Sequence, residues 1–369
     1  MSIKDLAFSV YSFFFNLGAK KAVVENRVGL VSMHNAHFTD GLGEIKREMG
    51  KGYKYLKIER KIDFKFLTTD AYRLGQCKYI FFNDNFMPLS KCRPNSKTTI
   101  VQLWHGMGAF KKFGMDIPQD SKVRAREIAA NKKLNFVVCS SPNVAEIYAN
   151  AFSVDLSKII DTGTPNQDFY FRKTHTHIYD TYPKLKNKFV ILYAPTFRDG
   201  ISNEEIFNNF DIEYIKSKLS SDVVLTVRMH PQVNNNAKFE EYKNATDYID
   251  VTDYKNVNEL CKAADLLITD YSSICMDFAL QRKPMIFFAY DLDYYKGARD
   301  FYFDYEKYVP GPIVKTKEEL VKTINEIYKK QKSGEETVDK IKLDKFYEFN
   351  FDSADGTATK QLLERILYN

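Results

Sequence analysis

The sequence predicts an α/β protein with two doubly wound sheets, and three observations support this class. Short apolar runs rich in β-branched residues recur along the chain, as expected for strands that are buried on both faces of a parallel sheet. Helical stretches separate many of these runs, which is the alternation of an α/β fold. A chain of 369 residues exceeds one hydrophobic core of ordinary size, so two domains are expected. The predicted strands are Val28–Met33, Tyr79–Asn83, Thr98–Trp104, Asn135–Cys139, Lys188–Tyr193, Asp222–Arg228, Leu266–Thr269 and Met285–Ala289, and the predicted helices include Pro142–Phe152, Asn258–Ala264 and Lys317–Gln331.

The domain junction is expected within Tyr170–Leu185, which is polar and lacks β-branched runs. This places an N-terminal helix in residues 1–22, a first domain in residues 23–172 and a second domain in residues 173–349. The terminal segment, residues 350–369, has a helical pattern over Thr357–Tyr368 and is expected to pack back on the first domain.

The five cysteines show neither CxxC spacing nor an even disulfide framework, so they are predicted to be reduced thiols in a cytosolic protein. They are Cys77, Cys92, Cys139, Cys261 and Cys275. The sequence indicates no metal-binding cluster and no cofactor.

Charge is distributed unevenly along the chain. The formal net charge is +6, but residues 1–140 carry a net charge of +12 and the remainder a net charge of −6. The basic residues are densest over Lys46–Lys65. A bias of this size favours a polyanionic partner, namely a nucleic acid, an anionic membrane surface or a phosphorylated substrate. The alternative is a solvated charged face, which is the better reading for any single lysine.

The uncharged segment Ala7–Ala19 is predicted to be an amphipathic helix in a membrane interface, flanked by basic residues that reach anionic headgroups. As a helix it extends about 20 Å, too short to cross a bilayer. Two alternatives stay open, a signal peptide and a helix packed on the first domain. Its apolar face has Leu6, Val10, Phe13, Phe14 and Leu17, its polar stripe Ser9, Ser12 and Asn16, and its basic flanks Lys4, Lys20 and Lys21.

The segment Gln102–Gly114 places a histidine, His105, directly behind a predicted strand. Gly106 and Gly108 follow and allow backbone to approach a ligand closely. Lys111 and its neighbour Lys112 suggest an anionic substrate. The alternative is a surface loop without chemistry.

Two further strands also deliver polar residues at their ends. Thr196 and Arg198 follow the strand that ends at Tyr193. The next predicted strand ends in Arg228, Met229 and His230, and Pro231 forces the residue before it into an extended conformation. Arginine binds phosphate oxygens in bidentate fashion, and His105 and His230 together are a candidate acid–base pair.

The strand Leu266–Thr269 leads through Asp270 into Ser272 and Ser273, which precede a helical pattern. A serine that caps a helix stands beside free N–H groups of the first turn, and these groups attract a phosphate. The sequence therefore predicts a diphosphate site here. The alternative is that both serines are only caps.

As a set, these segments resemble the CDP-glycerol glycerophosphotransferases that build wall teichoic acid. The matching segments are QLWHGMGAFKKFG, YAPTFRDG, RMHP and TDYSSICMDFAL followed by KPMIFFAYDLDYY, in the order and approximate spacing of that family. The resemblance covers nearly the whole chain from Val28 onward. By length the chain looks most like the primase members, which add the first glycerol phosphate to a lipid-linked disaccharide.

The resemblance implies two Rossmann-like domains of the GT-B type, with the acceptor on the first and a CDP-alditol on the second. It implies that His105 deprotonates the acceptor hydroxyl and that His230 lies near the diphosphate. Arg228, Ser272 and Ser273 would lie near the donor phosphates, with Asp270 orienting their loop. One departure is Asn166, which stands where many relatives have an arginine, so one phosphate or acceptor contact is in doubt. His34 and His37 receive no role.

The implied reaction is attack of an acceptor hydroxyl on the β-phosphorus of CDP-glycerol, with release of CMP, at the cytoplasmic face of the cell membrane. The partners would be CDP-glycerol or CDP-ribitol, a lipid-linked disaccharide and the anionic membrane surface, without nucleic acid. Three alternatives remain. They are a CDP-ribitol transferase or polymerase of the same family, a nucleotide-sugar GT-B glycosyltransferase or epimerase, and a non-enzymatic basic membrane-associated binding protein.

Overall fold

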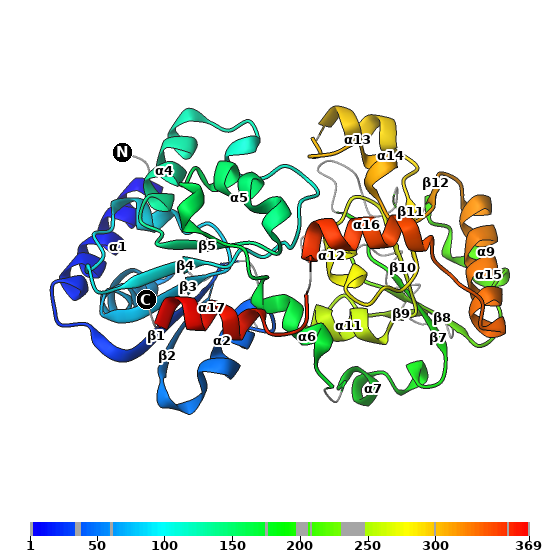
Figure 1. The fold of residues 1–369 in the computed structure, drawn as a ribbon, viewed down its shortest axis with the longest axis horizontal. Helices are drawn as coiled ribbons and strands as arrows, with labels where there is room; N and C mark the ends of the chain where they lie inside the picture. The colour runs from blue at the N-terminus through cyan, green and yellow to red at the C-terminus, as the bar shows by residue number, and fades with distance from the viewer. Residues whose placement is uncertain are drawn as a thin grey trace. The chain divides into compact units, whose positions relative to one another are not determined.

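The computed structural model describes residues 3–33, 38–59, 62–173, 176–196, 206, 209–229, 248–298, 300–352 and 354–367. The chain divides into two compact units. Unit 1 consists of residues 1–172 and 349–369, and unit 2 of residues 173–348 (Figure 1). The chain enters unit 2 after Arg172 and returns to unit 1 within helix α16 (Lys340–Phe351).

In its described part, unit 1 contains one parallel sheet of six strands in the order β2-β1-β3-β4-β5-β6. The strands are β1 (Val24–Ser32), β2 (Lys54–Glu59), β3 (Cys77–Phe82), β4 (Thr99–Gln102), β5 (Phe136–Val138) and β6 (Ile159–Ile160). The α-helices are α1 (Ile3–Ala19), α2 (Gly41–Met49), α3 (Ala71–Leu74), α4 (Ser121–Asn131), α5 (Ala145–Phe152), α6 (Asp168–Phe171) and α17 (Ala358–Leu367).

Unit 2 likewise contains, among its described residues, one parallel sheet of six strands in the order β12-β11-β10-β7-β8-β9. The strands are β7 (Phe189–Tyr193), β8 (Val223–Val227), β9 (Tyr248–Asp250), β10 (Leu266–Thr269), β11 (Met285–Phe288) and β12 (Ile313–Val314). The α-helices are α7 (Ile178–Thr181), α9 (Ile212–Ser217), α11 (Val257–Ala263), α12 (Ile274–Ala279), α13 (Leu292–Ala298), α14 (Tyr305–Tyr308), α15 (Lys317–Ser333) and the first part of α16.

Both sheets confirm the α/β class expected from the uninterrupted apolar runs. Strands β7, β8, β10 and β11 are buried along their whole length, because helices cover both faces of a parallel sheet. Strand β2 was not expected. Its sequence KYLKIE lies within the basic segment, and its side chains alternate between exposed and buried as at a sheet edge.

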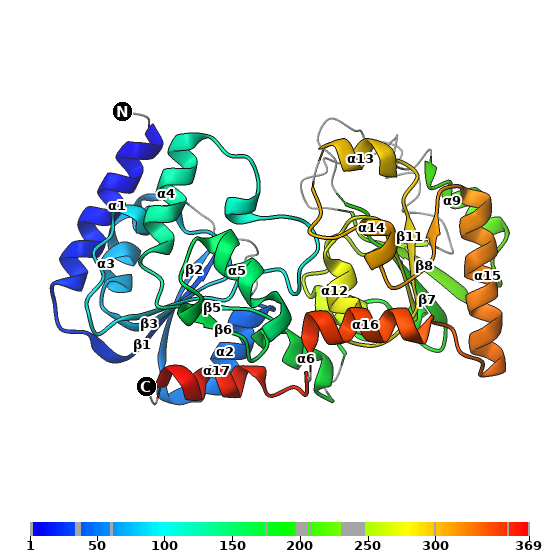
Figure 2. The same ribbon diagram turned by 45° about the horizontal axis from the view of Figure 1, so that its top comes forward.

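The C-terminal helix α17 belongs to the core of unit 1. Leu362, Leu363 and Ile366 pack in the same apolar cluster as Val28 of β1 and Val101 of β4. In both views of the ribbon α17 lies beside α2 (Figures 1 and 2). This helix therefore completes a domain whose strands all come from the first half of the sequence.

Candidate functional site

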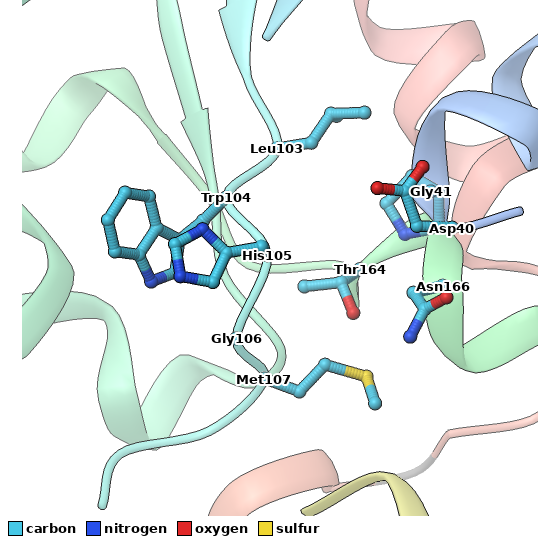
Figure 3. A pocket seen from close by; sticks show the side chains of 10 residues that line it. Asp40, Gly41, Leu103, Trp104, His105, Gly106, Met107, Thr164 and Asn166 are labelled. Carbon is cyan, nitrogen blue, oxygen red and sulfur yellow. The ribbon is translucent and has the colours of Figure 1, made fainter. Parts of the chain in front are cut away.

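A pocket in unit 1 lies where the parallel strands end. It is lined by residues that follow β4, by residues that begin α2, and by residues that follow β6 (Figure 3). These are Leu103, Trp104, His105, Gly106, Met107, Asp40, Gly41, Thr164, Pro165 and Asn166. The carboxyl ends of parallel strands are where open α/β sheets bind ligands.

The turn that presents His105 is a sharp one. Trp104 has a left-handed φ of 59°, which costs a non-glycine residue about 1–2 kcal/mol. Two interactions compensate for this strain. The Trp104 backbone N–H donates to Oε1 of Gln102 at 2.9 Å, and the indole stacks on Phe113 with ring centroids 5.3 Å apart. His105 lines the pocket, and its ring lies against the Trp104 indole with centroids 4.1 Å apart (Figure 3).

The His105 ring has a defined partner on one nitrogen. Its Nδ1 lies 3.2 Å from the backbone carbonyl oxygen of Asn83 and 3.9 Å from Oδ1 of Asp84. A carbonyl oxygen only accepts hydrogen bonds, so Nδ1 carries the proton of the neutral ring. Nε2 then has the lone pair, which is the form a general base requires.

Hydrogen bonds from two side chains hold the loop around His105. The Tyr148 hydroxyl lies within hydrogen-bond distance of the carbonyl oxygens of Gly106, at 2.8 Å, and Gly108, at 3.1 Å. The Gly108 N–H donates to Oγ of Ser140 at 2.9 Å. Gly108 has a left-handed φ of 63°, which glycine adopts at low cost, but a Cβ at position 106 would meet only ordinary contacts.

Polar residues that the sequence analysis did not single out support the same pocket. Asn83 donates through Nδ2 to Oγ of Ser32 at 3.0 Å and to Oδ2 of Asp40 at 2.6 Å. Asp40 also accepts from the Leu42 N–H and thereby caps α2. The available signal was the strand-end pattern itself, because Asn83 and Asp84 follow β3 as His105 follows β4.

Lys111, which the sequence suggested as a contact for an anionic substrate, does not line this pocket. The residue is half-buried. An anion contact from Lys111 therefore stays a prediction without support from the pocket.

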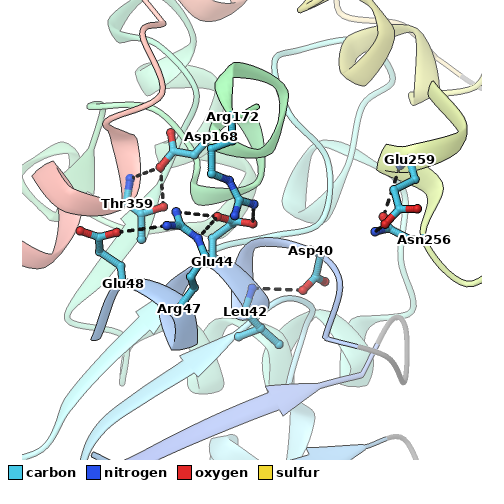
Figure 4. A network of polar contacts seen from close by, with 10 residues as sticks. All are labelled: Asp40, Leu42, Glu44, Arg47, Glu48, Asp168, Arg172, Asn256, Glu259 and Thr359. Atoms are coloured by element: carbon cyan, nitrogen blue, oxygen red, sulfur yellow. Dashed lines mark hydrogen bonds and ion pairs between the residues drawn. The ribbon is translucent and has the colours of Figure 1, made fainter. Parts of the chain in front are cut away.

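The segment that carries Asn166 ends in a structural aspartate. Asp168 accepts hydrogen bonds from the Thr359 backbone N–H and hydroxyl (Figure 4). It also accepts from the Ala358 N–H, and so caps α17. Burial raises the pKa of the Asp168 carboxyl, and the Thr359 hydrogen bonds partly offset this rise. Near it, Glu44 pairs with Arg47 and Arg172.

In unit 2, Asp270 joins two strand-end loops. Its Oδ1 accepts from the backbone N–H of Thr196 at 2.8 Å, and its carbonyl oxygen accepts from the Tyr305 hydroxyl at 2.9 Å. Asp270 and Thr196 are both buried. The loops after β7 and β10 are therefore held together by a carboxylate.

Among the described residues, the two serines after Asp270 make few side-chain hydrogen bonds. Ser272 Oγ accepts weakly from the Ile274 N–H at 3.4 Å, while the exposed Ser273 makes no side-chain cap bond to helix α12. The capping role considered for these residues is thus limited to a long contact from Ser272.

Arg228 has a structural role that the sequence did not suggest. Its Nη1 donates to three carbonyl oxygens, those of Val251, Thr252 and Tyr254, at 3.1, 3.2 and 2.7 Å. Burial lowers the pKa of this guanidinium. Nη1 therefore anchors the loop after β9, and a phosphate contact from the rest of the group stays a prediction.

Several residues of interest lie outside the described residues. They are Arg198, His230 and Pro231 of the expected donor side, and His34 and His37.

Helix α1 has two different faces. Tyr11 and Phe15 are buried, and Tyr11 packs against Phe66 and Phe86. The polar stripe also faces the protein, where Ser9 Oγ accepts from Lys91 Nζ and Asn16 Oδ1 accepts from the Arg93 N–H. The outward face is apolar, with Ile3, Leu6, Phe13 and Leu17 exposed by 89, 52, 63 and 41%.

The helix α1 is therefore packed on unit 1 and also presents apolar side chains to solvent. Phe14 is half-buried, and Lys20 and Lys21 at its end are exposed. In the described part of the chain, no helix has both the length and the apolarity that a bilayer crossing requires.

Relatives of this chain are found both in sequence and in structure. Residues 54–368 match the family model described as CDP-glycerol:poly(glycerophosphate) glycerophosphotransferase. The teichoic acid poly(ribitol-phosphate) polymerase of Bacillus spizizenii is 31% identical over 99% of this chain and 60% of its own length. The teichoic acid glycerol-phosphate primase of Bacillus subtilis is 32% identical over 69% of this chain and 66% of its own length.

The fold agrees with these sequence matches. The wall teichoic acid polymerase TagF, as a variant soaked with CDPG, has a TM-score of 0.82 and 23% identity over 98% of this chain and 93% of that one. The UDP-GlcNAc 2-epimerase of Neisseria meningitidis reaches only 0.58 at 11% identity, over 93% of this chain and 100% of its own. The chain spans 60% of the length of the poly(ribitol-phosphate) polymerase. Because the family model matches most of the sequence, this chain belongs to the CDP-glycerol:poly(glycerophosphate) glycerophosphotransferase family.

Proposed function

We propose that this chain transfers an alditol phosphate from a CDP-alditol to a hydroxyl of a membrane-linked teichoic acid acceptor, with His105 as the general base. The observation that carries this proposal is the contact of His105 Nδ1 with the Asn83 carbonyl oxygen, which assigns the lone pair of the neutral ring to Nε2 in a residue that lines a pocket. Family membership supplies the substrate class.

The reaction is a displacement at the β-phosphorus of the CDP-alditol. The acceptor oxygen forms a bond to the β-phosphorus, the bond from that phosphorus to the bridging oxygen breaks, and CMP leaves with the electron pair. The acceptor proton goes to His105 Nε2. General base catalysis of this kind contributes about 10²–10⁴-fold, and positioning of the two substrates contributes further.

We assign the acceptor to unit 1 and the donor diphosphate to unit 2, as two Rossmann-like domains of the GT-B type. On the donor side, Ser272 and Ser273 lie in the segment after β10, shortly after Asp270, whose carboxylate accepts from the Thr196 N–H. Arg198 and His230 are proposed to complete this side, with Arg228 contributing charge. Stabilisation of the leaving CMP is then electrostatic.

Glycerol phosphate is our first choice of transferred group, since the family model is named for it and the glycerol-phosphate primase of Bacillus subtilis is 32% identical. Ribitol phosphate is the second candidate. It is favoured by the poly(ribitol-phosphate) polymerase, whose match covers 99% of this chain, and by a ribitol-phosphate primase 33% identical over 75% of it.

We further propose that the enzyme works at the cytoplasmic face of the membrane, with the outward face of α1 in the interface. The exposed Phe13 and Leu17, the half-buried Phe14 and the exposed Lys20 and Lys21 support this placement, because apolar and basic side chains suit an anionic bilayer surface.

The test is incubation with CDP-glycerol or CDP-ribitol and a synthetic lipid-linked disaccharide. We expect CMP release and a product whose mass increases by one alditol phosphate or by several. Product length separates a primase from a polymerase, and the productive donor identifies the alditol. Release of UDP from a nucleotide sugar instead, or no transfer from either CDP-alditol, would contradict the proposal.

A further inference from the structure

The loop after β3 lies directly beside the loop that carries His105. Strands β3 and β4 pair in parallel, with Phe82 opposite Gln102 as the last pair of the ladder. The next residues of the two strands, Asn83 and Leu103, continue side by side, and the Leu103 N–H donates to the Phe82 carbonyl oxygen at 2.7 Å. Strand pairing therefore brings together Asp84, one residue after Asn83, and His105, two residues after Leu103.

The Asp84 carboxylate faces the protonated nitrogen of His105. Its Oδ1 lies 3.9 Å from His105 Nδ1, and both side chains are about one-quarter exposed. The hydrogen bond of Nδ1 goes to the Asn83 carbonyl oxygen, so Asp84 acts on the ring as a nearby charge. Partial burial weakens solvent screening of that charge.

Gln102 fixes the spacing between the two loops. Its buried side chain donates through Nε2 to the Asp84 carbonyl oxygen at 3.1 Å and accepts through Oε1 from the Trp104 N–H at 2.9 Å. One amide thus connects the residue before His105 to Asp84. The Asp84 carboxylate is itself oriented by the Asn85 N–H, which donates to Oδ1 at 2.6 Å.

We propose that Asp84 is the positioning residue of His105. It favours the tautomer of the neutral ring in which Nδ1 is protonated, and it stabilises the imidazolium that forms when Nε2 takes the acceptor proton. This inference rests on the proposed function for its catalytic consequence, but the pairing of Asp84 with His105 can be measured without any substrate.

Other charged groups line the same pocket or interact with Asp84. Asp40 lines the pocket with His105. On α4, Glu127 interacts electrostatically with Asp84 and with Arg124, and it accepts a hydrogen bond from Asn85. The Asp84 carboxylate is within ion-pair distance of Nδ1.

The direct test is an NMR titration of the protein with isotopically labelled histidine. The His105 resonance is assigned by its loss in His105→Ala. In Asp84→Asn we expect the His105 pKa to fall by about one unit, since a carboxylate favours the charged ring. Glu25→Gln, which removes an exposed carboxylate paired with Lys78 in the same unit, should leave it unchanged. An unchanged His105 titration in Asp84→Asn overturns the proposal.

The kinetic test uses CMP release across pH. For Asp84→Asn we expect kcat/KM to fall by about 10- to 100-fold, with its acidic limb moved to lower pH by the same unit. In the His105→Ala background the Asp84→Asn change should have no further effect, because Asp84 acts through the ring. A titration shift with unaltered kcat/KM overturns the positioning role. Full activity of His105→Ala instead refutes the proposed function and leaves the NMR result to decide the pairing.

Discussion

The two units have the same architecture, but their strand-end residues are used differently. In unit 1, His105 lines a pocket while Gln102, Tyr148 and Ser140 hold the backbone around it. In the described part of unit 2, Asp270 and Arg228 spend their hydrogen bonds on the backbone of neighbouring loops. A polar residue at a strand end is therefore available for chemistry only when other residues stabilise its loop.

The largest effect should come from His105. We expect His105→Ala to lower kcat/KM by about 10²–10⁴-fold, because the base is lost. The thermal unfolding midpoint should change little, since the ring is partly exposed and its loop is held by other residues. CMP release and calorimetry measure the two effects.

The matched control for this variant is His177→Ala, which removes an exposed histidine of unit 2. Normal activity is expected there. Equal activity losses in both variants would contradict a specific role for His105.

The second effect concerns the stability of unit 2. Asp270→Ala leaves the buried N–H groups of Thr196 and Tyr271 without their carboxylate, which costs about 2–5 kcal/mol. We expect Cys261 and Cys275 to react faster with a thiol reagent at pH 8. Peptide mass spectrometry reads each cysteine separately.

Unit 1 serves as the internal reference in that experiment. Its Cys77 and Cys139 are buried, and burial raises the pKa of each thiol to about 12. Their labelling should be unaffected by Asp270→Ala, and the exposed Asp293→Ala should accelerate neither pair. Faster labelling of all four cysteines would mean that the units do not unfold independently.

Arg228→Met tests whether this arginine, like Asp270, mainly stabilises the loops of unit 2. Loss of the three Nη1 contacts is expected to destabilise unit 2 by about 1–3 kcal/mol, measured as a lower denaturant midpoint. If Arg228 serves mainly the donor diphosphate, the result is instead a raised KM for the CDP-alditol with unchanged stability. That outcome would remove the contrast between the units.

The smallest effect on stability is expected at the outward face of α1. Phe13→Ser should change the free energy of unfolding by no more than about 0.5 kcal/mol, because Phe13 is 63% exposed. It should weaken binding to anionic vesicles about 10-fold, since one apolar anchor is lost. Co-sedimentation measures this binding.

Ile341→Ser is the control for vesicle binding, because Ile341 is similarly exposed but lies in unit 2. If both variants bind vesicles equally well, α1 is not the membrane contact. Phe15→Ala on the inward face of α1 should instead cost about 3–5 kcal/mol of stability.

Sequence patterns predicted the long buried strands well and the short ones poorly. All eight predicted runs correspond to strands, because continuous apolar segments rich in β-branched residues are typical of strands buried on both faces of a parallel sheet. The two- and three-residue strands β6, β9 and β12 have no periodicity of their own. The strand β2 was hidden by its lysines, which an exposed sheet edge tolerates.

The candidate site could be predicted only in part. His105 was predicted because a histidine and two glycines directly follow an apolar run. The pairing of β3 with β4 brings Asn83, Asp84 and Gln102 close to His105. The local sequence does not show which strands are neighbours, so these residues could not be predicted.

By itself, the sequence determined the α/β class, the strand that ends before His105, and a helix at each end of the chain. The tertiary structure decided which face of α1 lies against the protein. Ser9 and Asn16 face inward because Lys91 and Arg93 supply partners there, which leaves the apolar side of α1 outside. A side chain at a strand end or on a helix face takes the direction in which its hydrogen bonds can be satisfied, and those partners come from distant parts of the chain.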